Sequence, residues 1–296
     1  MATGYVKNKQ KLKGIRYMLF AIAAINAVIA VVFSVVSSFL ENPLPMYLQS
    51  LITGLCAYII PLFIYAKITG MTAQAAEEQF YLKKCKISHM IYALLLGVGW
   101  QFVMVVISIP MSLIFKGAAD VAPITVTDLI AAIFVIGIMP AIFEEFLFRG
   151  IVDGSMSELN SRAAVIFSSV MFAVLHADIY NFVGYIIMGV IMTGLVRRTG
   201  TVYSAMIFHF ANNITALLLG FFNSELVYTP ILTITIFAVG VIGFAVVFAA
   251  FKSVTKKPEK VKAISTSTLL GQSFINIPIL LCFVVLAAAM VIMSTY

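Results

Sequence analysis

Two adjacent glutamates and an arginine close a long apolar stretch of this 296-residue chain, in the sequence EEFLFRG at 144–150. A charge inside a bilayer is costly, so ionisable residues in an apolar segment indicate a functional site. On an α-helix, Glu145 and Arg149 lie one turn apart and can pair. Glu144 points about 100° away from Glu145 and is left without a local partner. The spacing therefore predicts a structural Glu145–Arg149 pair and a carboxylate, Glu144, that faces another group.

Two histidines, His176 and His209, lie inside other apolar stretches, and Asn213 follows His209 at a spacing of four residues. That spacing places His209 and Asn213 on one helical face. A carboxylate in a low-dielectric pocket can act as a general base near neutral pH. Imidazole and amide groups can donate hydrogen bonds to a developing oxyanion. These residue types therefore favour hydrolysis.

The same residues permit a second chemistry. Glu144, His176 and His209 could supply three ligands to a zinc ion and leave its fourth position to water. The sequence HExxH does not occur in the chain, so three separate helices would have to assemble such a site. The residue types leave both a metal-free and a zinc-assisted reaction open.

The elements that must position these side chains are membrane-spanning helices. The chain is 62% hydrophobic and only 10% charged, with a mean hydropathy of +1.08, whereas soluble domains carry about 25% charged residues. Because lipid offers no partner to backbone polar groups, we expect an all-α transmembrane bundle. Apolar stretches predict about nine spans, with eight as the alternative. They run at about 17–40, 46–68, 89–115, 126–148, 162–178, 180–196, 201–221, 227–251 and 274–295.

Nearly all lysines and arginines fall in loops on one side of this map, which places the N-terminus in the cytoplasm. The formal net charge of +7 is therefore a topological signal, and no nucleic-acid partner is expected. No internal repeat or long linker divides residues 1–296, which predicts a single membrane domain. The short basic loops favour the plasma membrane of a bacterium.

Three short motifs resemble those of a known family. EEFLFR, FAVLH and HFANN are similar to the EExxxR, FxxxH and HxxxN motifs of the CPBP family. This family comprises the CAAX-protease and bacteriocin-processing (Abi) intramembrane proteases, which are related to the Rce1-type CAAX endopeptidases. The motifs occur in order in three different predicted spans, and the resemblance covers about residues 123–221. We expect this segment to be the catalytic core.

The resemblance implies a role for each motif residue. Glu144 would activate a water molecule with help from His176, while His209 and Asn213 would stabilise the oxyanion. Glu145 would hold the site together. The predicted catalytic residues are Glu144, Glu145, His176, His209 and Asn213.

Two further residues would support the site. Arg149 would pair with Glu145, and Phe172 would pack around His176. Asn212 is adjacent to Asn213 and could take its place. Because bacterial members of the family are commonly described as metalloproteases, zinc at Glu144, His176 and His209 is the one candidate cofactor.

Three function classes follow from these patterns. The first is an intramembrane endopeptidase that cleaves a membrane-associated, prenylated or bacteriocin-like peptide. The second is a non-enzymatic immunity or scaffold protein of the same fold, in which Glu145–Arg149 only fixes helix register. The third is a proton-coupled transporter that uses the carboxylates as a relay. The expected partners are the lipid bilayer and a membrane peptide or lipidated protein.

Overall fold

The computed structural model describes residues 2–39, 44–115, 126–225 and 230–294. Every regular element within these ranges is a helix, and the only β-type pairing there is an isolated bridge between Asn160 and Lys262. The predicted all-α architecture is confirmed. The chain divides into two compact units, which comprise residues 1–80, 146–177 and 260–296 (unit 1) and residues 81–145 and 178–259 (unit 2). The predicted single domain stays a prediction.

Within the described residues, seven helices are long and apolar enough to cross a membrane, or eight if one bent pair counts as a span. The chain is thus a multi-pass membrane protein, and the seven or eight candidate spans of its described residues agree with the predicted alternative of eight rather than with nine. The stretch predicted at 162–178 forms the helix Ser161–Leu175, whose 15 residues reach about 22 Å. This is shorter than the hydrocarbon core of about 30 Å. The side on which the N-terminus lies stays a prediction.

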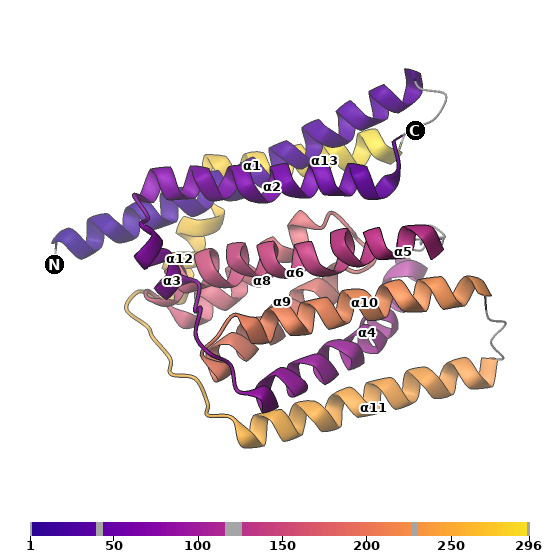
Figure 1. The fold of residues 1–296 in the computed structure, drawn as a ribbon. Helices are drawn as coiled ribbons and strands as arrows, with labels where there is room; N and C mark the ends of the chain where they lie inside the picture. Colours follow the sequence, from indigo (N-terminus) through magenta and orange to yellow (C-terminus); the bar gives the residue numbers. More distant parts are fainter. Residues whose placement is uncertain (1, 40–43, 116–125, 226–229, 295–296) are drawn as a thin grey trace. The chain divides into compact units, whose positions relative to one another are not determined.

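Unit 1 is built from three separate stretches of the chain. Its helices are α1 (Ala2–Phe39), α2 (Met46–Thr69), α3 (Ala73–Gln79), η2 (Phe146–Asp153), α7 (Gly154–Ser157), α8 (Ser161–Leu175), α12 (Thr266–Phe274) and α13 (Ile277–Ser294). Helix α1 contacts both α2 and α13 (Figure 1). The buried residues of α1 recur at helical spacing because one stripe faces these neighbours. They are Gly14, Ile15, Met18, Leu19, Ile22 and Ala23.

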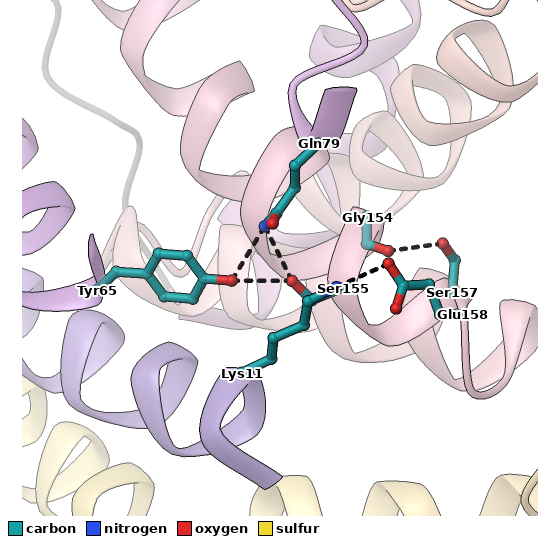
Figure 2. A network of polar contacts seen from close by, with 7 residues as sticks. All are labelled: Lys11, Tyr65, Gln79, Gly154, Ser155, Ser157 and Glu158. Carbon is teal, nitrogen blue, oxygen red and sulfur yellow. Dashed lines mark hydrogen bonds and ion pairs between the residues drawn. The ribbon is translucent and has the colours of Figure 1, made fainter. Parts of the chain in front are cut away.

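A buried polar cluster joins three helices of unit 1. The Gln79 amide nitrogen donates to the Tyr65 hydroxyl and to Ser155 Oγ, each at 3.0 Å, and the two hydroxyls lie 3.1 Å apart (Figure 2). The C-terminal end of α7 is held by an ion pair of 2.7 Å between Lys11 and Glu158, the residue that follows the helix (Figure 2). These contacts fix the segment that directly follows η2 to α2, α3 and α1.

The segment after residue 260 returns to unit 1 through backbone contacts. Asn160 caps α8, since its Oδ1 accepts the N–H groups of Arg162 and Ala163. The same side chain donates from Nδ2 to the Ile264 carbonyl oxygen at 2.7 Å. The N–H groups of Ala263 and Ile264 both donate to the Leu159 carbonyl oxygen. Helix α12 then begins and is bent by 58° from α13.

Unit 2 contains α4 (Ile87–Phe115), α5 (Val126–Ala132), η1 (Ile133–Ile138), α6 (Met139–Glu145), α9 (Phe182–Thr199), α10 (Tyr203–Glu225) and α11 (Pro230–Val254). Helix α4 contacts α10 and α11 (Figure 1). Gly97 permits the close approach of α4 to α10, because a Cβ there would clash with the Phe208 carbonyl oxygen. Gly200, at φ 75°, ends α9 and donates its N–H to the Val196 carbonyl oxygen, which turns the chain into α10.

Candidate active site

Two π-helical turns flank the helix that carries the paired glutamates. In η1, which precedes α6, the Met139 N–H donates to the carbonyl oxygen of Phe134, five residues earlier. The second π-helix, η2, begins directly after Glu145. π-Helical turns are rare and occur frequently at functional sites. Because each holds an additional residue, it rotates the following side chains away from the positions that α-helical spacing predicts.

Glu145 and His209 form a buried pair within unit 2. Glu145 Oε1 lies 2.9 Å from His209 Nδ1, and the two side chains are 0% and 2% exposed. Because a carboxylate oxygen accepts, Nδ1–H is the donor, and this bond sets the orientation of the imidazole ring. The Nε2 atom is then the ring nitrogen directed away from Glu145. The pair connects the C-terminal end of α6 to α10.

Asn213 lies one turn beyond His209 on α10 and contacts the first π-helix. Its Nδ2 donates to the Ile136 carbonyl oxygen at 2.9 Å, and its Oδ1 accepts from Asn212 Nδ2 at 3.1 Å. An amide nitrogen carries two N–H groups, so the bond to Ile136 leaves the second for another acceptor. The structure thus brings Glu145, His209 and Asn213 together in one unit.

Glu144 precedes Glu145 and is half-buried. In the same unit, Asp178 Oδ1 accepts the N–H groups of Tyr180 and Asn181 at the start of α9. The Tyr185 hydroxyl, one turn into α9, hydrogen-bonds Asp178 and interacts electrostatically with Glu144. Tyr185 therefore belongs to the polar surroundings of Glu144, and Asp178 holds the tyrosine.

The second motif lies in unit 1, at the C-terminal end of α8. His176 Nδ1 donates to the Phe172 carbonyl oxygen at 2.6 Å, which makes Nε2 the acceptor nitrogen of the neutral ring. The Phe172 ring is fully buried, with its centroid 4.5 Å from that of His176. The Arg149 guanidinium lies over the same phenylalanine ring, at 4.6 Å from its centroid. Phe172 is thus a packing surface for both polar residues.

The predicted Glu145–Arg149 pair depended on α-helical spacing. Glu145 ends α6, whereas Arg149 lies inside π-helical η2, so the four-residue step between them is not one α-helical turn. The two residues also belong to different units. Their pairing stays a prediction, and His209 is a partner of Glu145 that spacing did not predict.

The predicted zinc site needs three ligand side chains that lie close together in the described residues. No group of three or more His, Cys, Asp and Glu side chains there lies close enough together to hold a metal ion. Of the three proposed ligands, Glu144 and His209 belong to unit 2 and His176 to unit 1. The zinc site therefore stays a prediction.

Comparison with known proteins supports the motif resemblance. Residues 126–215 match the family model described as Type II CAAX prenyl endopeptidase Rce1-like. We call residues 126–215, which are similar to this family, the Rce1-like segment. It runs from α5 into α10 and lies within the predicted core of about 123–221, whose residues 123–125 are outside the described ranges. No curated protein matches the chain.

The Rce1-like segment contains every predicted site residue and implies protease activity in general. Three contacts in it escaped the sequence analysis. The Glu145–His209 bond and the Ile136 carbonyl contact joined residues far apart in the chain, which no local pattern reveals. Asp178 had a usable signal, because an aspartate shortly before an apolar helix is typical of an N-terminal cap.

Proposed function

We propose that the chain is an intramembrane endopeptidase that hydrolyses a peptide bond of a prenylated or otherwise membrane-bound peptide. The observation that carries this proposal is the buried Glu145–His209 hydrogen bond, with Asn213 one turn further along α10. Burying a carboxylate in a membrane bundle is costly, and such groups usually mark a functional site. The match of residues 126–215 to an endopeptidase family supports the same reaction class.

In the proposed reaction, Glu144 accepts a proton from water, and the resulting hydroxide attacks the carbonyl carbon of the scissile peptide. His209, from Nε2, and Asn213, from Nδ2, donate hydrogen bonds to the oxyanion. When the intermediate collapses, the C–N bond breaks and Glu144 returns the proton to the leaving amine. Glu145 holds the His209 ring and balances the charge of its protonated form, and the motif resemblance implies that His176 assists Glu144.

The proposed substrate follows from the family description, which names a CAAX prenyl endopeptidase. A farnesylated peptide that ends in a CAAX sequence is therefore the first probe. The proposed location is a bacterial plasma membrane, as the positively charged loops suggest.

The experiment compares the purified full chain, Glu144→Gln and Glu78→Gln in liposomes, with a fluorogenic farnesylated CAAX peptide. Glu144→Gln keeps the shape of the side chain but cannot accept the proton, so cleavage should be lost. Glu78→Gln makes the same chemical change at an exposed position of α3 and should cleave like wild type. Equal cleavage by wild type and Glu144→Gln would exclude this mechanism and favour the scaffold function.

Peptides of the host cell provide a second readout. In cells that express wild type or Glu144→Gln at equal levels, a precursor that accumulates only with the variant would identify the natural substrate. A cellular phenotype rescued equally by both forms would instead support a non-enzymatic role.

A chelator separates the two proposed forms of the reaction. If cleavage persists in 1,10-phenanthroline, the water is activated by Glu144 without a metal. If cleavage is lost and added zinc restores it, Glu144, His176 and His209 are the residues to test as ligands.

A further inference from the structure

Asn212 is a buried amide that directly precedes the predicted oxyanion donor. Its side chain is 5% exposed, and its Nδ2 donates to Asn213 Oδ1 at 3.1 Å. Asn213 in turn donates from Nδ2 to the Ile136 carbonyl oxygen at 2.9 Å. Two side-chain amides and one backbone carbonyl thus form a chain of hydrogen bonds from α10 to η1, all within unit 2.

The direction of this chain follows from hydrogen-bond chemistry. A backbone carbonyl oxygen can only accept, so the nitrogen of the Asn213 amide must face Ile136. The Asn213 oxygen then faces Asn212, which must present its own nitrogen. Rotating either amide by half a turn would bring two oxygens or two NH₂ groups into contact. The two bonds therefore fix which side of Asn213 carries its second N–H.

The side-chain oxygen of Asn212 indicates that this residue does not serve to stabilise the fold. Within the described part of the chain, its buried Oδ1 has no hydrogen-bond partner. An unpaired buried oxygen destabilises a fold, whereas an apolar side chain of similar shape avoids that cost. A residue selected for packing alone would not keep this oxygen.

We infer that Asn212 is a positioning residue, which acts through Asn213 by holding its amide in the orientation that directs an N–H toward the oxyanion. This inference rests on the proposed function. Asn212 itself contacts neither substrate nor the reacting atoms. Its effect should appear in the rate of the chemical step, with little change in substrate binding.

A double-mutant cycle tests this inference, with the full chain in liposomes and the farnesylated CAAX peptide as probe. The variants are Asn212→Leu, Asn213→Ala, the double variant and the control Thr215→Val. Loss of one oxyanion donor lowers kcat by roughly 100-fold, so Asn213→Ala should fall by about that factor. Asn212→Leu should lower kcat by about tenfold, since it weakens rather than removes the same interaction, and KM should stay within about twofold.

In the Asn213→Ala background, Asn212→Leu should change kcat by less than about twofold, because its target is absent. The melting temperature of Asn212→Leu should stay close to that of wild type, because the substitution removes the unpaired Asn212 oxygen but also takes the donor from Asn213 Oδ1. A clear fall in the melting temperature would indicate a stabilising role instead. Asn212→Ser, too short to reach Asn213, provides the same test if the leucine does not fold. Thr215 Oγ1 donates to the Ala211 carbonyl oxygen of its own helix, and Thr215→Val should cleave like wild type.

The outcomes distinguish a failure of the inference from a failure of the proposed function. If the effects of Asn212→Leu and Asn213→Ala multiply, or if Asn212→Leu and Asn212→Ser both keep the wild-type kcat, the inference is wrong while the proposed function stands. If wild type cleaves no peptide, or Glu144→Gln cleaves as well as wild type, the proposed function and the inference both fail.

Discussion

Gly97 offers a test of how helix packing supports the candidate site. A Cβ at this position would clash with the Phe208 carbonyl oxygen and lie 2.8 Å from the Cβ of Ala211. Ordinary contacts begin near 3.4 Å, so Gly97→Ala must move α4 and α10 apart by at least about 0.6 Å. His209 directly follows Phe208 on α10, so the displacement reaches the residue that bonds Glu145.

The magnitude follows from two opposing effects. Overpacking costs about 1–3 kcal/mol, and a rigid backbone carbonyl favours the upper end of that range. Replacing glycine by alanine inside a helix stabilises the helix by about 1 kcal/mol. The net loss of about 2 kcal/mol should lower the melting temperature by about 4–8 °C. Because a 1 Å misplacement in an active site can reduce the rate about 100-fold, cleavage should fall about tenfold.

The assay uses the fluorescence of Trp100, the only tryptophan of the chain, which is buried on α4 and packs on Phe244 with a ring separation of 5.4 Å. Its emission during heating reports the α4 packing directly. Gly194→Ala is the matched control, because a Cβ at this helical glycine of α9 meets nothing within 4 Å. If Gly97→Ala is as stable and active as Gly194→Ala, the close approach of α4 to α10 is not as described.

Three further predictions concern the site, the return of the chain to unit 1 and a loop. Glu145→Gln keeps an acceptor for His209 but removes its counter-charge, so cleavage should fall about 100-fold or more while melting changes little; an unchanged rate would remove Glu145 from the mechanism. Asn160→Ala should lower stability by about 1 kcal/mol through loss of the α8 cap. Asn160→Asp keeps the capping oxygen but not the donor to Ile264, so it should lower stability by less than Asn160→Ala does. Equal falls in the melting temperature of the two variants would contradict the capping role. Burial raises the pKa of the Cys85 thiol, so a smaller fraction of it is thiolate at neutral pH. Maleimide should therefore react more slowly with Cys85 than it reacts with free glutathione, and the reaction with Cys85 should reach its half-maximal rate at a higher pH. Measurement on Cys56→Ala/Cys282→Ala isolates this thiol, and a pH profile like that of glutathione would show that the site is not buried.

The sequence was sufficient to predict the helical membrane fold and the segment that carries the motifs. Apolar length alone locates helices such as α4 and α11, because the bilayer fixes how long a span must be. Apolar length was misleading at α8, where the apolar run at 162–178 was predicted to be a span but forms a helix of only 15 residues. Hydropathy does not reveal where a cap such as Asn160 begins a helix or where His176 ends it.

At the candidate site, the helical spacing of His209 and Asn213 was readable, since α10 is a regular α-helix through both. The spacing argument for Glu145 assumed that its helix stays α-helical, and the π-helix at 146–153 has no compositional signature that would warn against this. The partner of Glu145 lies 64 residues away, and only tertiary structure could supply it.

The contacts of residues 261–264 with the start of α8 determine the order in which the two units are completed during synthesis. The Leu159 carbonyl oxygen accepts bonds from Ala263 and Ile264, which leave the ribosome about a hundred residues later. Until then, the Leu159 carbonyl oxygen just before α8 lacks these two bonds. Contacts between residues this distant in sequence form slowly. Unit 1 is consequently completed after unit 2, and a chain stopped after α11 could form the helices of unit 2 but not the hydrogen bonds to Leu159.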